Sequence, residues 1–311
     1  MDFLNRVNPE LRDTLLLNPV LRLPEDLAAT RLIPTPPTSN SELVRITERF
    51  ISGGDGQEML IKIYEPDCRD VAKLPAVLWC HGGGYVLGHP NSEDNLCERF
   101  VLAVNCVVIS PDYRLAPENP YPAGLEDCYS ALVWMTNLAE ELNIDLNRVA
   151  IGGGSAGGGL TAALSLLARD RKGPAICFQM PLYPMIDDRN ITLSSYEITD
   201  PLAVWYRGNN IAAWEMYLGS HSNEEISPYA APTRADNLAG LPPTYTCVGQ
   251  LDPFRDETID YVARLAQAGV EVEFHLYPGC FHAFEHIVPD ADISERAKST
   301  YITAMAMTLN K

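Results

Sequence analysis

The chain has 311 residues, 46% hydrophobic and 21% charged, a length and composition typical of a globular protein of one or two domains. Its formal net charge of −18 repels phosphate backbones and anionic lipids, so neither nucleic acid nor a membrane is an expected partner. The eight cysteines are scattered without a C-x-x-C pair, and the sequence shows no signal-peptide core and no run of about 18 apolar residues. These features favour a cytoplasmic location over a disulfide scaffold, a zinc protein or a membrane protein.

The predicted elements begin with a helical segment and continue with two strands. Apolar residues recur at helical spacing up to about residue 32, and the proline-rich stretch 33–40 is typical of a linker. Residues 44–52 and 59–64 alternate between apolar and polar, which predicts two strands, and the glycine-rich stretch between them predicts a turn.

From residue 76 onward, strand-like and helix-like segments alternate. We predict strands at 76–79, 106–110, 148–151, 176–180, 244–248 and 270–276, and helices at 92–104, 123–142, 156–171, 254–268 and from about 291. This alternation predicts one α/β domain over 1–311, with a mostly parallel central sheet flanked by helices. Residues 184–243 interrupt the alternation and are too long for a plain connection, so we interpret them as an inserted cap.

The most informative motif is G-G-S-A-G at 153–157, which fits G-x-S-x-G between a predicted strand and a predicted helix. In a nucleophile elbow the serine, here Ser155, occupies a strained turn, and side chains two residues before and after it would collide. Read from Gly152, the same stretch also fits G-x-G-x-x-G, the fingerprint of a dinucleotide-binding site. A flexible structural turn is the third interpretation.

A second glycine-rich motif separates these alternatives. His81 is followed by three glycines directly after the predicted strand 76–79. This H-G-G-G pattern is typical of esterase oxyanion loops, whose glycines let backbone N–H groups approach the substrate carbonyl oxygen. A dinucleotide site does not use such a loop, so the two motifs together favour a serine hydrolase.

A hydrolase of this type places an acid and then a histidine after the serine in the chain. Asp252 follows the predicted strand 244–248 at its carboxyl end, where sites form in open α/β sheets, so we predict that it is the acid. Asp256 and Glu257 fall in the next predicted helix, where they fit better as charges that complement the helix dipole.

Three histidines follow the predicted acid. His275 lies inside the predicted strand 270–276 and is interpreted as structural, whereas His282 lies on the loop after it, where the base is expected. His282 to His286 also spells H-x-x-E-H, a metalloprotease pattern that needs a long helix, and Pro289 interrupts such a helix. No third metal ligand stands out, so we expect no metal site and interpret His286 as a cap or surface residue.

Together these motifs resemble those of the bacterial hormone-sensitive-lipase-like esterases of the α/β-hydrolase fold, over nearly the whole chain. The resemblance is carried by H-G-G-G at 81–84, D-Y-R-L-A-P-E at 112–118, G-G-S-A-G at 153–157, D-P at 252–253 and His282. The stretches 202–219 and 229–232 look like the subset of this family that acts on small acetyl and aryl esters.

The resemblance implies the roles of the site residues. Ser155 would be the nucleophile, His282 the base and acid, and Asp252 the partner that orients the histidine, with no cofactor. The oxyanion hole would consist of the backbone N–H groups of Gly83, Gly84 and Ala156. Tyr85 and Trp205 would line the substrate pocket.

The resemblance also implies how the site is enclosed. Residues 1–40 and 184–243 would form a cap, and the segment around Arg114 would brace the oxyanion loop. The sequence departs from the family at Gly154, where Asp or Thr is usual, and at Gly159, where Asn is frequent. Loss of a side chain at 154 is expected to remove hydrogen bonds that hold the elbow or the oxyanion loop.

The expected function is hydrolysis of short acyl esters, acetyl to about hexanoyl, of small or aryl alcohols through an acyl-enzyme. The motifs do not separate esters from amides or formamides, and some relatives use the fold to bind small molecules without catalysis. Because His282 is present, catalysis is favoured over simple binding. A small ester is the expected partner, and a homodimer is compatible with the sequence although no pattern indicates one.

Overall fold

One eight-stranded sheet organises the computed structural model, which describes residues 3–39, 41–69, 72–220 and 225–311. The strands lie in the order β1-β2-β4-β3-β5-β6-β7-β8, and within these residues every strand except β2 runs in the same direction. Their bounds are β1 Val44–Ser52, β2 Glu58–Pro66, β3 Leu74–Cys80, β4 Val107–Pro111, β5 Ile144–Gly154, β6 Phe178–Leu182, β7 Thr244–Leu251 and β8 Val272–Phe281.

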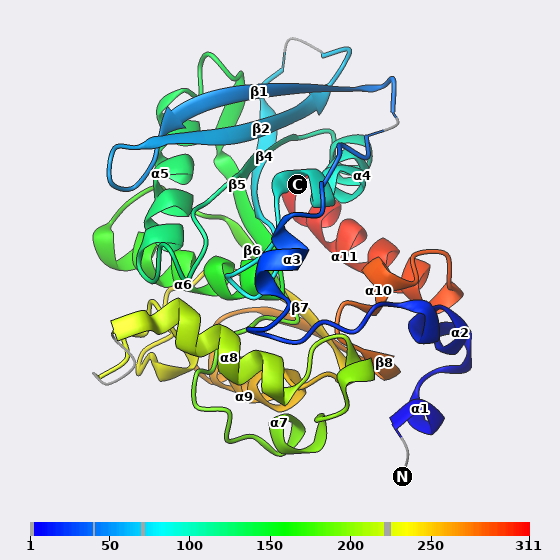
Figure 1. Ribbon diagram of the computed structural model, residues 1–311. Coiled ribbons are helices and arrows are strands. Elements are labelled where there is room, and N and C mark those ends of the chain that lie inside the picture. The colour runs from blue at the N-terminus through cyan, green and yellow to red at the C-terminus, as the bar shows by residue number, and fades with distance from the viewer. Residues whose placement is uncertain (1–2, 40, 70–71, 221–224) are drawn as a thin grey trace.

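Helices cover both faces of this sheet (Figure 1). One face carries α5 (Ala123–Asn137), α6 (Ala156–Arg171) and α9 (Arg255–Gln267), and the other carries α4 (Asp94–Val104) and α11 (Asp292–Leu309). In β3, Leu78 packs with the core on the α5 and α6 side, whereas Val77 and Trp79 pack with the core on the α4 and α11 side. Because both faces are buried, this strand is a continuous apolar run.

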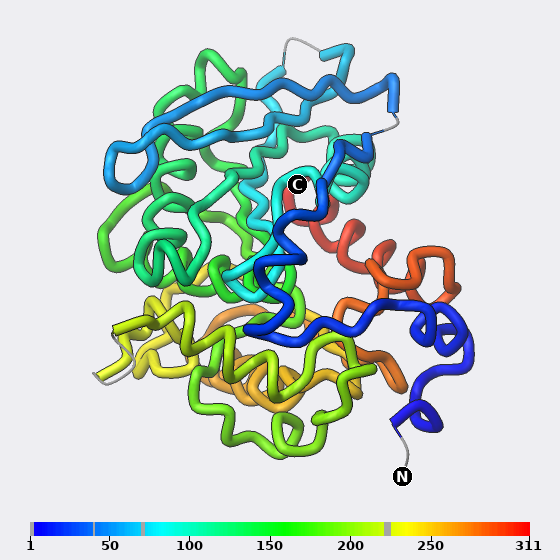
Figure 2. Tube along the Cα trace, in the orientation of Figure 1, coloured from blue at the N-terminus to red at the C-terminus, as the bar shows by residue number. Residues whose placement is uncertain are grey.

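The remaining helices lie in the N-terminal segment, in the insertion and in the loops around the site. They are α1 Phe3–Arg6, α2 Pro9–Leu17, α3 Leu27–Arg31, η1 Pro90–Glu93, α7 Leu193–Glu197, η2 Pro201–Ala203, α8 Arg207–Leu218, η4 Pro232–Arg234 and α10 Phe284–Ile287. Figure 2 shows the N-terminal trace crossing the front of the molecule from α2 to α3 before it reaches β1. Within the described ranges, every helix is too short or too polar to cross a membrane.

The structure contains each predicted strand and helix from residue 44 onward, although β5 and β8 extend beyond the predicted 148–151 and 270–276 and one helix is shorter than predicted. The helix predicted over 123–142 ends at Asn137, because the chain turns there so that Ile144 can pair with Leu74 at the start of β5. The N-terminal segment forms three short helices rather than a continuous one, since Pro9 begins α2 and Pro19 follows its end. Residues 1–2, 40 and 221–224 of the two predicted cap segments lie outside the described residues.

A buried ion pair connects the sheet to the start of α4. Lys62 of β2 and Asp94 are 1% and 0% exposed, and the Lys62 ammonium lies 2.5 Å from the Asp94 carboxylate. The ammonium also donates to Asn91 Oδ1 at 2.8 Å, and the Tyr64 hydroxyl donates to Asp94 Oδ1 at 2.7 Å. The backbone N–H of Thr38 donates to the other Asp94 oxygen at 2.9 Å. This network therefore fixes η1, α4 and the end of the N-terminal segment against the sheet.

Replacing Lys62 with Met should strongly destabilise the fold, because it leaves the Asp94 charge buried without its cation. We expect the free energy of unfolding, measured by urea denaturation, to fall by about 3–5 kcal/mol. Arg49→Met is the control, since Arg49 pairs with Glu141 at the surface with both side chains about half exposed, and it should cost less than about 1 kcal/mol. Equal, small losses for both variants would contradict this role of the buried pair.

Candidate active site

Ser155 occupies a strained turn between β5 and α6. Its backbone angles are φ 58° and ψ −121°, a region that residues other than glycine rarely adopt. A Cβ atom on Gly157 would lie 2.0 Å from the Cys80 carbonyl oxygen, and one on Gly153 would lie 2.5 Å from the same atom. The close approach of α6 to β3 therefore requires both glycines and holds the serine above the sheet. Because the turn needs these contacts, it is not a merely flexible glycine segment.

The predicted acid and base meet this serine. His282 follows β8 directly, and its Nε2 lies 2.9 Å from Ser155 Oγ, while its Nδ1 lies 2.7 Å from Asp252 Oδ2. Asp252 is 0% and His282 3% exposed, so the polar chain is shielded from water. The backbone N–H of Phe254 donates to the second Asp252 oxygen at 2.9 Å, which fixes the carboxylate plane. This is the geometry that a serine nucleophile, its base and an orienting acid require.

The other histidine candidates lie away from Ser155 Oγ. His275 lies within β8 and its Nε2 is 2.9 Å from the Glu273 carboxylate. His286 is exposed on α10, a helix of only four residues, so H-x-x-E-H lacks the long helix that a metalloprotease motif needs. His81 is fully buried, and this burial lowers its pKa to about 4, so its ring is neutral at physiological pH.

The two remaining acidic candidates have different positions. Asp256 accepts a hydrogen bond from the backbone N–H of Ser194 at 2.7 Å and pairs with Arg255, at the start of α9 as predicted. Glu257 also lies in the first turn of α9 as predicted, but it is not exposed to solvent. It is 2% exposed, and burial raises its pKa well above the usual value for a carboxyl group. The sequence missed this burial, because the insertion that covers Glu257 is distant in the chain.

The H-G-G-G segment forms a loop beside Ser155. Gly83 and Gly84 have φ angles of +119° and +62°, and both line the same cavity as Ser155. Ala156 is the first residue of α6, so its N–H is one of the helix donors without a partner inside the helix. The three backbone groups predicted for the oxyanion hole thus lie just after the ends of two neighbouring strands, β3 and β5.

Bracing of this loop comes from residues beside Arg114. The Tyr113 hydroxyl donates to the His81 carbonyl at 2.7 Å, and the two rings stack with centroids 4.1 Å apart. The backbone N–H of Ala116 donates to the Tyr85 carbonyl at 3.0 Å. Arg114 itself binds Asp127 through its backbone and side chain, so it stabilises the segment that does the bracing.

A cavity of about 370 Å³ opens at Ser155. Its lining comes from the oxyanion loop, from the N-terminal segment and from the insertion, and includes Gly83, Gly84, Ser155, His282, Leu21, Val204 and Trp205. Leu21 lies within residues 1–40, the first of the two predicted cap segments. Val204 lies within the predicted cap segment 184–243, but its positive φ of 66° after η2 was not predicted, because a valine gives no signal for it.

The two predicted pocket residues lie in different places. Trp205 covers Gly84, where a Cβ atom would be 2.3 Å from the indole, and its ring centroid lies 6.2 Å from that of His282. Tyr85 does not line the cavity. Its ring stacks on Tyr217 at 3.9 Å, because its positive φ of 64° turns the side chain into the core.

The hydroxyl groups of two tyrosines occupy the space beside Gly154 and Gly159, the two glycines that depart from the family pattern. A Cβ atom on Gly154 would lie 2.9 Å from the Tyr183 hydroxyl, and one on Gly159 would lie 2.0 Å from the Tyr85 hydroxyl. The Tyr85 hydroxyl donates to the Met185 carbonyl at 2.6 Å across this gap. Backbone bonds hold the elbow, since Ser155 N donates to Leu182 O and Ser155 O accepts from Met185 N, each at 3.0 Å.

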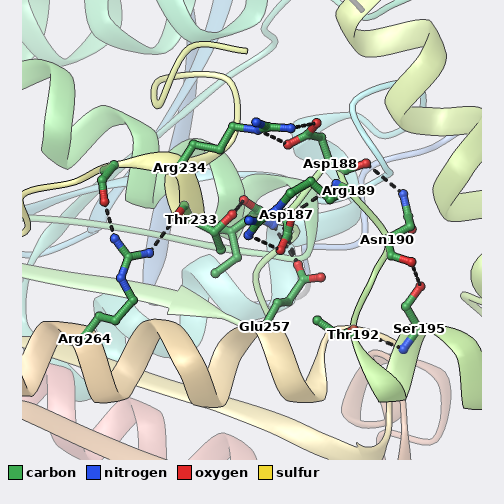
Figure 3. Close-up of polar contacts among 12 residues, drawn as sticks. Asp187, Asp188, Arg189, Asn190, Thr192, Ser195, Thr233, Arg234, Glu257 and Arg264 are labelled. Carbon is green, nitrogen blue, oxygen red and sulfur yellow. Dashed lines mark hydrogen bonds and ion pairs between the residues drawn. The ribbon is translucent and has the colours of Figure 1, made fainter. Parts of the chain in front are cut away.

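A polar network anchors the start of the insertion to α9 (Figure 3). Glu257 of α9 accepts hydrogen bonds from the backbone N–H groups of Ile186 and Asp187 at 3.0 and 3.3 Å. Asp187 pairs with Arg189 at 2.7 Å, and Asp188 pairs with Arg234 at 2.6 Å. The start of the insertion is therefore fixed to the helix that follows the acid loop.

Comparisons with known proteins agree with this fold and site. A family model described as the alpha/beta hydrolase fold matches residues 77–286. The chain is 34% identical to esterase LipI of Mycobacterium tuberculosis over 86% of this chain and 83% of that protein. It is 35% identical to an arylesterase of Saccharolobus solfataricus, over 73% of each chain. The solved structure of a bacterial heroin esterase superposes with a TM-score of 0.94 and 39% identity, over all of both chains.

These matches, together with the elbow, the glycine loop and the serine–histidine–aspartate arrangement, agree on one family. The chain belongs to the hormone-sensitive-lipase-like esterases of the α/β-hydrolase fold and is a carboxylesterase.

Proposed function

We propose that the protein is a serine carboxylesterase that hydrolyses short acyl esters, acetyl to about hexanoyl, of small or aryl alcohols through an acyl-enzyme. The observation that carries this proposal is the hydrogen-bonded chain from Ser155 through His282 to Asp252, which ends in the cavity beside Gly83 and Gly84. We further propose that the described parts of 1–40 and 184–243 act as its cap, since Leu21 and Trp205 contribute to the cavity wall.

The first half of the reaction transfers the acyl group to the enzyme. His282 Nε2 accepts the Ser155 proton as Oγ attacks the ester carbonyl carbon, and Asp252 stabilises the resulting imidazolium. Backbone N–H groups of Gly83, Gly84 and Ala156 donate to the oxyanion, each being worth about 2.7–4 kcal/mol in comparable sites. The carbon–oxygen bond to the alcohol then breaks, and His282 gives its proton to the leaving oxygen.

The second half restores the serine. His282 removes a proton from a water molecule, whose oxygen attacks the acyl carbon, and the same N–H groups donate hydrogen bonds to the negatively charged carbonyl oxygen. Collapse of the intermediate breaks the bond to Oγ, and His282 returns the proton to Ser155. The carboxylic acid leaves, and no cofactor enters either half of this proposal.

The restriction to short acyl groups is supported by the position of Trp205. Its indole lies over Gly84 and near His282, and its Nε1 donates to Asn210 Oδ1 at 3.1 Å. Asn210 in turn donates to Asn190 Oδ1 at 2.6 Å, so the ring is held in place from behind. A large, fixed side chain this close to the oxyanion loop limits the length of acyl chain that fits beside Ser155.

We propose a cytoplasmic location for this enzyme. All eight cysteines are free thiols, and six of them are buried. Cys80 and Cys128 lie with their sulfur atoms 3.6 Å apart in the core and still share a hydrogen bond rather than a covalent bond. Thiols that lie this close together without forming a disulfide bond are typical of proteins from a reducing compartment.

Ser155→Ala should lose ester hydrolysis by at least about 10⁴-fold in kcat, because the acyl-enzyme can no longer form. The measurement is turnover of p-nitrophenyl esters from acetyl to palmitoyl, with wild type fastest on the short chains. Ser299→Ala, at an exposed serine of α11, is the matched control and should keep full activity. Wild type as inactive as Ser155→Ala on esters would reject the proposal, and turnover of matched amides would then identify an amidase.

Trp205→Ala should shift selectivity toward longer chains, since it removes the wall over Gly84. We expect the ratio of kcat/KM for octanoyl against acetyl p-nitrophenyl esters to rise about tenfold, as newly buried methylenes gain contact with the protein. Trp134→Ala, a half-buried tryptophan of α5, provides a matched control for general loss of packing. A similar ratio in both variants would show that Trp205 does not set the chain length.

A further inference from the structure

The active-site cavity has a single carboxylate in its wall. Glu93, the last residue of η1, is 7% exposed and is the one acidic side chain among the described residues that line this cavity. None of these lining residues is a lysine or an arginine. A largely buried charge is costly unless hydrogen bonds or an opposite charge compensate it, so the partners of Glu93 decide what this wall accepts.

The Trp79 indole fixes one end of this carboxylate. Trp79 of β3 is 1% exposed, and a Cβ atom on Gly152 would lie 2.6 Å from its ring, so the indole lies directly against the backbone of β5. The ring also packs on Phe100, with centroids 5.0 Å apart. From this fixed position its Nε1 donates to Glu93 Oε2 at 3.0 Å. The core of the protein therefore sets where the carboxylate lies.

The second oxygen of Glu93 is left for a molecule in the cavity. Oε1 has no hydrogen-bond partner in the described part of the chain, and it keeps accessible surface where Glu93 lines the cavity. An ionised carboxylate accepts hydrogen bonds and has no proton to donate. The free oxygen therefore favours a ligand group that carries an N–H or O–H donor.

Cations on the elements next to Glu93 already have other partners. Lys62 of β2 lies 2.5 Å from the carboxylate of Asp94, and Arg99 of α4 lies 2.5 Å from that of Glu295. Within the residues that the structure describes, Glu93 forms no ion pair. Its charge is therefore left for a partner from outside the chain to balance.

Glu93 lies on the histidine side of Ser155. Ser92, its neighbour in the chain, and His286 both line the active-site cavity and a second cavity of about 440 Å³, so these two residues share one side of the site. His286 belongs to α10, which begins two residues after His282. Because His282 must lie beside the leaving oxygen to protonate it, the alcohol part of a bound ester extends over this side.

We propose that Glu93 is a specificity residue that selects esters whose alcohol part carries a protonated amine. The proposal rests on the esterase function proposed above and names its substrate class more closely. An ammonium N–H in the alcohol part donates to Glu93 Oε1, while Trp79 keeps Oε2. Such a bond joins a charged donor to a charged acceptor, which makes it stronger than a neutral hydrogen bond, and it balances the charge in the cavity wall.

The test compares two acetate esters of the same shape. Dimethylaminoethyl acetate carries a protonated amine at neutral pH, and isoamyl acetate has a carbon atom in place of that nitrogen. We expect wild type to have the higher kcat/KM for the charged ester. Glu93→Gln should lower the ratio of charged to neutral kcat/KM about tenfold, because the amide keeps the shape and an acceptor for Trp79 but loses the charge. The same ratio in both proteins would overturn the proposal.

Two controls locate the effect. Glu215→Gln, at an exposed acid of α8, should leave the ratio unchanged, which controls for the general negative field of the protein. The second control moves the amine to the acyl part, by comparing ethyl β-dimethylaminopropionate with ethyl isocaproate. Glu93→Gln should leave the ratio for this acyl pair as it is in wild type. A loss for the acyl pair as large as for the acetate pair would overturn the assignment to the alcohol part.

The neutral ester separates this inference from the function on which it rests. Normal turnover of isoamyl acetate without any effect of charge would reject the role of Glu93 and leave the esterase function intact, whereas no turnover of any of these esters by wild type would reject the function itself. Should Glu93→Gln not fold, wild type alone decides. A kcat/KM for the charged ester at or below that for isoamyl acetate overturns the proposal.

Discussion

The close approach of α6 to the carboxyl end of β3 is the constraint on which the site depends. With no side chain at Gly153 or Gly157, the helix meets the Cys80 carbonyl directly, and Ser155 is forced into its strained turn. The strand order places β3 beside β5, so the glycine loop that follows β3 must lie next to the serine. The acid and the base follow β7 and β8, the next pair of strands beyond β6, at the same edge of the sheet.

The sequence was sufficient to predict this arrangement because each part has a local signature. Ser155, Asp252 and His282 each follow a recognisable strand, and the strands are parallel, so their carboxyl ends had to meet. The extent of α6 matches the predicted helix 156–171, whereas the order of the strands within the sheet was not predicted, because it depends on contacts between distant segments. The helix after residue 123 was predicted too long, because its end is set by the pairing of Ile144 with Leu74 rather than by its own sequence.

Burial of individual side chains was not predictable in the same way. Tyr85 was expected in the pocket and packs on Tyr217 instead. Glu257 lies in the first turn of α9 as predicted, but its burial beneath the insertion was not predicted. Both outcomes depend on residues more than 50 positions away in the chain. The buried acids show the same dependence, since Asp94 is balanced by a lysine and Glu257 by backbone N–H groups.

The N-terminal segment has a consequence for how the active site assembles. Arg31 donates to the Val86 carbonyl beside the oxyanion loop, the Leu23 N–H donates to Asn209 of α8, and the Asn8 N–H donates to the Gly279 carbonyl of β8. Two of these three contacts join the N-terminal segment to residues 209 and 279, so they form only after most of the sequence between them has been synthesised. The wall of the cavity is therefore completed late, because α8 and β8 must both be present before this segment can be fixed across the site.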